Sequence, residues 1–286
     1  MLLLLACLLL PVALQADTES SLTLSLRHHS NIPNAPDSAN RLGDRLFSAD
    51  YQSTRIFVTE PGAWFSLGLA AGVTALQHTT GMNHIQAGVT AGYSRRLGLG
   101  AYAPRLFVDT RLMREHWDGS VRSRWSGQIE TTLTKRLSPA WMLSGSLAVH
   151  RQDASRRYAL QPNPAFDVDV FDQRRHQFVL RADHVLENGQ AISMQYRYLD
   201  GDLDASARPG TPLLNVTDAI VRDNGINKGY LAYRIDARSH ELGVQWNTPL
   251  GDNSSVSLGA GQQRASAARG LRYRSNIVHI DYHVRF

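Results

Sequence analysis

The chain ends in NIVHIDYHVRF, residues 276–286, and from residue 278 onward this stretch alternates between two kinds of side chain. Apolar side chains stand at every second position, namely Val278, Ile280, Tyr282, Val284 and Phe286. The positions between them carry His279, Asp281, His283 and Arg285. Successive side chains of a β-strand point to opposite faces, so the stretch predicts a strand with one apolar and one charged face. The apolar face must lie against either a protein core or lipid.

The N-terminus indicates that the protein is exported. MLLLLACLLLPVALQA, residues 1–16, is an apolar run with small residues at Ala13 and Ala16. It resembles a secretory signal peptide cleaved after Ala16, which predicts a signal peptide at 1–16 and a mature domain at 17–286. Cys7 is the only cysteine and would leave with the signal, so neither a disulfide nor a thiolate metal site is expected in the mature chain. No later apolar stretch is long enough to predict a transmembrane helix.

Period-two alternation recurs along the whole mature sequence. It is clearest at 22–26, 65–73, 85–93, 141–149, 192–198, 242–246 and 256–260. Weaker alternation occupies 51–59, 104–115, 123–136 and 176–186. With the last strand these make about twelve strands, each near the 9–11 residues that a tilted strand needs to cross a bilayer. The sequence therefore predicts an all-β fold, a transmembrane antiparallel β-barrel.

The connections between these strands alternate in length. Short turns are expected at 60–62, 137–140, 187–189 and 248–253, and long polar loops near 30–50, 152–173 and 200–228. Short turns on one side and long loops on the other are typical of outer-membrane barrels, whose turns face the periplasm. A secreted soluble β-sandwich also has alternating strands, but this asymmetry is not expected of it.

The polar residues of the strands predict a hydrated lumen. A dry core would leave these charges unpaired, at a cost of several kcal/mol each. The predicted lumen-lining residues are Arg27, Asp109, Arg111, Glu130, Arg181, Asp183, Arg197, Glu241, Asp281 and Arg285. If the lumen is open, its arginines are expected to favour anions modestly.

Aromatic residues near the strand ends predict two interfacial girdles. The periplasmic girdle would contain Phe65, Tyr93, Trp141, Trp246 and Phe286. The outer girdle would contain Trp117, Trp125, Tyr198 and Tyr233. The apolar faces of the strands are therefore expected to meet lipid.

The last strand resembles the C-terminal assembly signature of Gram-negative outer-membrane proteins, with a terminal Phe286 and apolar residues at Val278, Ile280, Tyr282 and Val284. The resemblance implies an outer-membrane location and recognition by the barrel-assembly machinery. It implies no particular activity, because a fold does not specify a function.

One short motif suggests an alternative function. LRHHSNIPN contains His28, Ser30 and Asn31, and this string is similar to the one carrying the catalytic histidine and serine of outer-membrane phospholipase A and lipid A deacylases. In that reading His28 activates Ser30, and Asn276 on the last strand orients the imidazole. In the other reading Asn31 and the prolines that follow simply turn the chain out of the membrane.

Charge and composition limit the classes of binding partner that the sequence predicts. Of the 30 basic residues, all but Lys135 and Lys228 are arginine, and the formal net charge is +5. The loop segments ASRRY, 154–158, and QRRH, 173–176, could pair with lipopolysaccharide phosphates or could be solvated loops. Arginines interspersed along strands do not predict nucleic-acid binding. No pattern predicts a metal site or a cofactor, and the oligomeric state is left open.

Three functions remain compatible with the sequence. The first is a narrow pore or passive barrel, since about twelve strands lie between the eight of a filled barrel and the sixteen of an open porin. The second is a lipid-facing acyl hydrolase using His28 and Ser30. The third is an accessory surface barrel that works through its long loops.

Overall fold

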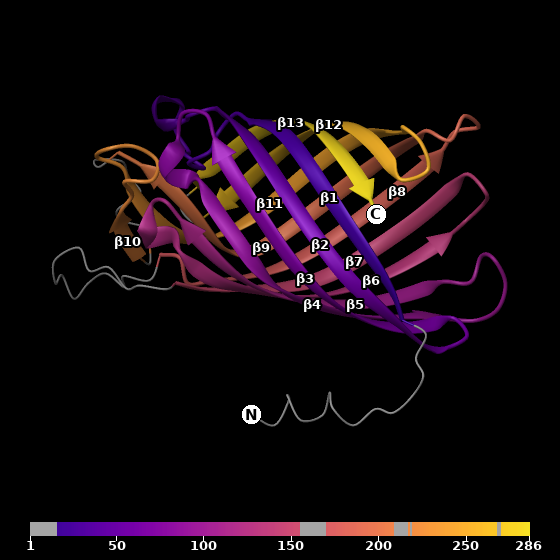
Figure 1. The fold of residues 1–286 in the computed structure, drawn as a ribbon. Helices are drawn as coiled ribbons and strands as arrows, with labels where there is room; N and C mark the ends of the chain where they lie inside the picture. Colours follow the sequence, from indigo (N-terminus) through magenta and orange to yellow (C-terminus); the bar gives the residue numbers. More distant parts are fainter. Residues whose placement is uncertain (1–15, 155–169, 209–216, 218, 268–269) are drawn as a thin grey trace, which may run out of the picture.

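The protein is described from a computed structural model covering residues 16–154, 170–208, 217, 219–267 and 270–286. Figure 1 shows a tilted, closed barrel of antiparallel strands. Its long strands are β1 (Ala16–His29), β2 (Asp44–Glu60), β3 (Ala63–Leu76), β4 (His84–Arg96), β5 (Arg105–Trp117), β6 (Arg124–Arg136), β7 (Trp141–Ala154), β8 (Gln173–Val185), β9 (Ala191–Ala207), β11 (Leu231–Pro249), β12 (Ser254–Ala267) and β13 (Arg272–Arg285). The prediction of a twelve-stranded transmembrane barrel is confirmed.

Two pairings close the sheet into a cylinder. The first strand pairs with the last, from Ser21 opposite Arg285 to His29 opposite Ile277. β9 pairs with β11 along its whole length, from Ala191 opposite Asn247 to Ala207 opposite Leu231. Closure gives every spanning strand two hydrogen-bonded neighbours, which a bilayer demands because it offers no water to an unpaired edge.

One additional short strand lies outside this cycle. β10 (Ala219–Arg222) pairs with Leu231–Arg234 at the outer end of β11, where β12 no longer accompanies it. Three short 3-10 turns lie in the connections at the same end, η1 (Ser38–Asn40), η2 (Thr80–Met82) and η3 (Ser120–Arg122). No helix in the described part of the chain is long and apolar enough to cross a membrane.

The predicted short turns and long loops lie where they were expected, but the alternation is not uniform, since the connection at 97–104 is longer than the outer one at 118–123, and two of the long loops are shorter than expected. β2 begins at Asp44, so the loop predicted at 30–50 ends at residue 43. β9 runs on to Ala207, and β10 interrupts the predicted loop at 200–228. The extension of β2 includes Phe47, which is exposed on the outer face opposite Leu26 of β1, so this part of the predicted loop belongs to the barrel wall. Glycine permits the tight turns, with φ of +86° at Gly62 and +80° at Gly189.

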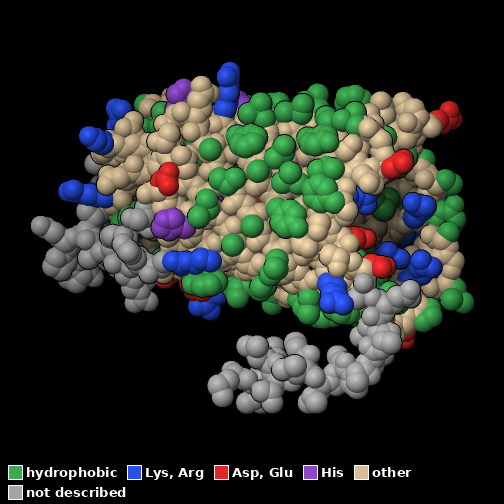
Figure 2. Space-filling view, viewed as in Figure 1, with side chains coloured by type: hydrophobic (Ala, Val, Ile, Leu, Met, Phe, Trp, Pro, Cys, Tyr) green, Lys and Arg blue, Asp and Glu red, His purple; other side chains and the backbone are tan. Residues whose placement is uncertain are grey.

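The apolar residues of the strands cover the outside of the barrel. Leu69, Leu147 and Met194 are each 64% exposed and Leu242 is 65% exposed. Figure 2 shows such side chains gathered across the middle of one outer face. In water this surface would be unfavourable, so its natural environment is lipid.

Two of the predicted outer-girdle aromatics are wrong. Trp117 is 9% exposed and Tyr233 is 3% exposed, because both have the inward parity of their strands. Trp125, at 48%, does lie on the outside. The alternation that places Asp109 and Arg111 in the lumen also places Trp117 there, and this parity should have excluded it.

Candidate functional site: an outer cap above the lumen

The apolar face of β11 changes sides along the strand. In its membrane half the exposed residues are Leu242, Val244 and Trp246. In its outer half the apolar residues Tyr233, Ile235 and Ala237 are buried inside, while Asp236 and Arg238 point outward. The side-chain period is unbroken, so the environment has inverted and not the strand. This inversion marks where the strand leaves lipid.

The outer halves of neighbouring strands build a conventional core there. One buried cluster contains Leu203, Ala205, Ala207, Ile220, Tyr233, Ile235, Ala237, Ala265 and Tyr273. A second contains Val170, Phe171, Ala219, Val221 and Ala232. We call this region, together with the loops that pack on it, the cap. It lies at the outer end of the barrel interior.

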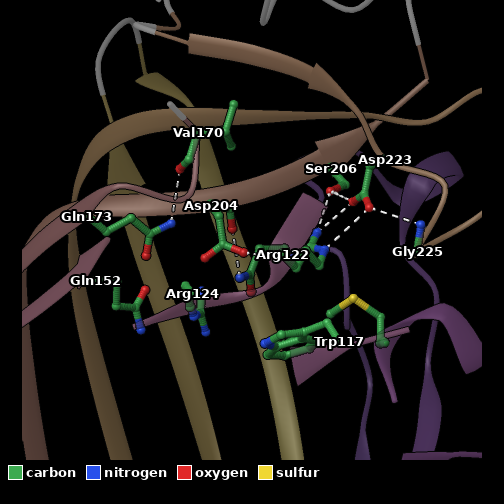
Figure 3. A network of polar contacts seen from close by, with 12 residues as sticks. Trp117, Arg122, Arg124, Gln152, Val170, Gln173, Asp204, Ser206, Asp223 and Gly225 are labelled. Atoms are coloured by element: carbon green, nitrogen blue, oxygen red, sulfur yellow. Dashed lines mark hydrogen bonds and ion pairs between the residues drawn. The ribbon is translucent and has the colours of Figure 1, made fainter. Parts of the chain in front are cut away.

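Arg122, the last residue of η3, joins separate segments of the cap. Its guanidinium donates to Asp223, with Nη2–Oδ2 at 2.6 Å and Nε–Oδ1 at 3.3 Å. It also donates from Nη1 to Asp204 Oδ2 at 3.0 Å and from Nη2 to Ser206 Oγ at 3.2 Å. Figure 3 shows Arg122 between these carboxylates. We call this network the Arg122 lock.

The Arg122–Asp223 pair at the centre of the lock is buried, whereas the side chain of Asp204 is 21% exposed. The side chain of Arg122 is 4% exposed and that of Asp223 is 0% exposed. The Arg122 guanidinium carbon lies 4.7 Å from the ring centroid of Phe171. Burial lowers the pKa of Arg122, but Asp223 and Asp204 outweigh it and hold that pKa above its usual value. Arg122 therefore stays charged, and removing it would leave buried carboxylates uncompensated.

Three glycines let the cap loops meet at close range. The amide of Gly119 donates to the carbonyl of Gly81 at 2.8 Å. A Cβ on Gly81 would lie 2.6 Å from the Cα of Gly225, which is closer than any side chain tolerates. Asp223 also accepts from the Gly225 amide at 3.2 Å, which ties this contact to the lock.

A chamber of about 330 Å³ lies at this end of the barrel, with Arg122 and Asp204 in its wall. Arg124, Trp117 and His84 also line it. Trp117 stacks on His84 at 4.0 Å between ring centroids. Arg124 Nε donates to Glu115 Oε2 at 2.8 Å, and Trp117 Nε1 donates to the same oxygen at 3.2 Å. Ion pairs and aromatic rings therefore hold the chamber wall.

Two further cavities hold most of the predicted lumen residues. Arg27, Arg181, Arg197, Glu241 and Asp281 line a cavity of about 260 Å³. Asp109, Arg111 and Glu130 line another of about 330 Å³ on the opposite side of the strand order. Figure 2 shows charged side chains around a hollow at the end of the barrel where the chain terminates.

Among the described residues, four of the ten predicted lumen residues form arginine–carboxylate pairs, one pair along β8 and one between β9 and β11. Arg181 Nε donates to Asp183 Oδ1 at 2.8 Å, and Ser193 Oγ donates to the same carboxylate at 2.5 Å. Arg197 Nη1 donates to Glu241 Oε2 at 3.0 Å. Arg285 stands apart from these cavities, exposed at the periplasmic rim. The ten residues are five arginines and five carboxylates, so they leave little net charge to select between anions and cations.

The structure brings together only part of the His28 motif. Ser30 lies beside Asn276, whose backbone amide donates to Ser30 Oγ at 2.8 Å. The Asn276 side-chain oxygen accepts from Gln262 at 2.8 Å. His28 instead lies between Val278 and Arg45 in the strand register. Among the described residues no hydrogen bond joins His28 to Ser30 or to Asn276.

Of the two basic loop segments, only QRRH lies wholly within the described residues. ASRRY lies outside the described residues except for Ala154. In QRRH, Arg174 and His176 are exposed, whereas Arg175 turns inward and donates to Gln152 at 2.9 Å and Gln173 at 2.6 Å. Within the described ranges no group of three His, Cys, Asp or Glu side chains is placed to hold a metal ion.

Sequence reasoning missed the residues of the lock. Arg122, Asp204 and Asp223 fall in or beside segments that the sequence assigned to connections. A signal was present, since the apolar parity of β11 reverses between Ile235 and Leu242. The apolar AIV at 219–221 inside a presumed polar loop was a second signal.

Comparison with known proteins identifies the fold. No protein-family model and no curated protein matches the chain. An outer-membrane channel from Pseudomonas putida F1 superposes with a TM-score of 0.58 at 11% identity, covering 97% of both chains. The TodX monoaromatic hydrocarbon channel deltaS2 mutant gives 0.45 at 9% identity, covering 94% of this chain and 89% of its own. The KdgM porin, in complex with disordered oligogalacturonate, gives 0.44 at 7% identity, covering 92% and 98%.

Of these three superpositions, the one on the Pseudomonas putida channel shows a shared fold. That likeness extends over nearly the whole chain, cap and spanning strands together. The closed twelve-stranded sheet and the apolar outer surface are those of a membrane-spanning β-barrel. The chain therefore has the fold of a closed, membrane-spanning β-barrel, the fold that an outer-membrane channel of known structure also has.

Proposed function

We propose that the protein is a narrow channel for small hydrophilic solutes, closed at its outer mouth by the cap and opened when the Arg122 lock releases. The observation that carries the proposal is the position of Arg122, buried above the lumen and bonded to Asp223, Asp204 and Ser206. A passive plug would need only an apolar core. A charged lock is held by a few strong contacts that can be broken together.

The interior supports conduction of polar solutes. The cavities of about 260 and 330 Å³ within the wall are lined mainly by charged and polar side chains, which suit water and hydrated solutes, and Arg122, Arg124 and Asp204 reach the more apolar chamber at the outer end. The relative from Pseudomonas putida with the same fold is described as an outer-membrane channel. Because the predicted lumen residues include five arginines and five carboxylates, their charges nearly cancel, and we expect weak charge selectivity.

Planar-bilayer recording tests the proposal. The wild-type protein should give rare, brief steps, and Arg122→Gln should lengthen the openings because the cap loses its central cation. Arg151→Gln is the matched control, since that arginine is 59% exposed on the outer wall. Silence of Arg122→Gln over many insertions, with correct barrel folding confirmed, would refute the channel.

We also propose that the signal peptide at 1–16 is removed on export and that the barrel-assembly machinery reads the last strand. The alternating side chains of β13 support this, since Val278, Ile280 and Tyr282 are exposed toward lipid. The terminal amide of Phe286 donates to Ser20 at 2.9 Å, so the last residue is part of the closing seam. Deleting Phe286 should lower surface levels in cells while leaving the refolded barrel nearly as stable as wild type.

A further inference from the structure

Two arginines stand opposite each other on the lipid-facing side of β12 and β13. The strand register pairs Arg264 with Arg274, and both side chains are exposed. They share the outward face with the apolar Leu258 of β12 and Val278 of β13. Like charges directly opposite in an antiparallel ladder destabilise it. The barrel therefore carries a repulsion here that an external anion would relieve.

The cationic surface extends along the same level of the barrel. His240 on β11 is the register partner of Arg264, and one step further out lie Arg238 on β11 and Arg272 on β13. We call Arg238, His240, Arg264, Arg272 and Arg274 the arginine row. Tyr196 holds His240 in place, with its hydroxyl 2.8 Å from His240 Nδ1.

Carboxylates balance little of this charge. Arg238 lies 3.4 Å from Asp200 Oδ1, and this pair is largely exposed. Among the described residues no ion pair joins Arg264, Arg272 or Arg274 to a carboxylate. Arg264 Nε donates to the Gln262 side chain at 2.7 Å, which orients the guanidinium and leaves its two terminal nitrogens for another partner.

The row lies where the strands leave lipid. Below it the exposed residues are Leu242, Leu258 and Val278. On the inward face at the same level Ala265 and Tyr273 are buried in the cap, and Ile235 is buried further out on β11. From Tyr282 to Arg274 the strand rises roughly 27 Å, which a tilt of about 40° reduces to roughly 20 Å, close to the height of the apolar band. The arginines thus stand at the level of the outer-leaflet headgroups.

We propose that the arginine row binds the phosphate groups of lipopolysaccharide in the outer leaflet, while the lipid A acyl chains pack on Leu242, Leu258 and Val278 below. Guanidinium groups match phosphate geometry with paired hydrogen bonds. A phosphate between Arg264 and Arg274 converts their repulsion into two charge-assisted contacts. This interaction is on the outer wall and is independent of whether the lumen conducts.

Binding can be measured with the full mature barrel in nanodiscs that lack lipopolysaccharide. Lipid A is titrated against wild type, against Arg264→Gln/Arg274→Gln, and against Arg95→Gln/Lys135→Gln as control. Arg95 and Lys135 are exposed near the periplasmic ends of β4 and β6, so the control removes the same charge from the opposite rim. The arginine-row variant should bind about tenfold more weakly, while the control matches wild type.

Two further probes identify the ligand. Dephosphorylated lipid A should bind wild type and the arginine-row variant equally, since no phosphate is left for the arginines. Inorganic phosphate should not displace lipid A, because it lacks the acyl chains. Equal binding of lipid A to wild type and the arginine-row variant, or displacement by inorganic phosphate, would overturn the proposal.

Thermal unfolding gives a readout that a folding defect cannot imitate. Without lipid A, the arginine-row variant should unfold at the same temperature as wild type or higher, because the like-charge contact is gone. Adding lipid A should raise the unfolding temperature of the wild type more than that of the arginine-row variant. An equal rise in the two proteins would contradict lipid A binding at the arginine row. Arg274→Gln alone should show an intermediate rise in unfolding temperature.

Discussion

The spanning wall and the outer cap use the same strands with opposite faces. On β11 the wall exposes Leu242 and Val244, while the cap buries Tyr233 and Ile235. The wall places its charges inside, whereas the outer half of β11 places apolar groups inside and Asp236 and Arg238 outside; the buried charges of the cap belong to the Arg122 lock. One strand therefore crosses from a lipid solvent to an aqueous one without a break in its pairing. The solvent, and not the strand, decides which face is apolar.

Ion pairs in the wall and in the cap also differ in their access to water. In the wall, Arg197 and Glu241 pair beside a hydrated cavity, where water shares the cost of the charges. In the cap, Arg122 and Asp223 pair without water, so each depends on the other. A charge change in the cap should therefore be far more damaging than one in the lumen.

The largest expected effect is on the lock. Arg122→Ala leaves Asp223 and Asp204 uncompensated and should destabilise the cap by about 3–5 kcal/mol. Limited proteolysis should then cut within the cap, while heat-modifiable migration of the barrel is retained. Arg151→Ala, on the exposed wall, should leave the cap resistant. An intact cap in Arg122→Ala would remove the distinction between dry and hydrated ion pairs.

A new charge on the wall should have the next largest effect. Val244→Arg inserts a cation into lipid and should cost about 2 kcal/mol in urea unfolding from lipid vesicles. Asp236→Arg is on the same strand and face but beyond the inversion, so its cost should be near zero. Similar costs for the two variants would mean that the inversion does not mark the membrane boundary.

Removal of one methylene should distinguish a protein core from a lipid contact. Ile235→Val opens a small void in the cap and should reduce amide protection there by about 1 kcal/mol in hydrogen exchange. Leu242→Val removes the same group from the wall, where lipid refills the space, so protection should hardly change. A larger loss at Leu242 would contradict the assignment of the two surfaces.

The smallest effect is expected at the His28 motif. Ser30 Oγ accepts the Asn276 amide and is not joined to His28, so Ser30→Ala should change neither barrel folding nor any activity on lipid. Fatty-acid release from phospholipid or lipid A is the measurement. Release by wild type that disappears in Ser30→Ala would make the hydrolase the better description.

The wall could be predicted from the sequence because lipid imposes a strict period. Alternation such as Leu242, Val244, Trp246 needs no tertiary information, and it gave the strands, the turns and the inward parity of Arg181 and Arg197. The errors at Trp117 and Tyr233 came from residue type outweighing that parity.

The cap could not be predicted as a site, because its contacts join distant segments. Arg122 and Asp223 are 101 residues apart, and nothing local to either indicates the other. The close approach of Gly81, Gly119 and Gly225 likewise depends on three separate loops meeting. Only the reversed parity of β11 was visible, and its meaning depends on knowing where the bilayer ends.

A cysteine scan of β11 tests the central claim most directly, because the predicted mature chain contains no cysteine. Oxygen, which concentrates in lipid, should enhance the relaxation of spin labels at Leu242→Cys and Val244→Cys. A polar nickel complex, which stays in water, should enhance the relaxation of labels at Asp236→Cys and Arg238→Cys. The label at Ile235→Cys should contact neither, since that position is 2% exposed. Lipid contact at 236 equal to that at 244, or reagent access at 235 equal to that at 236, would contradict a cap that begins where the apolar face inverts.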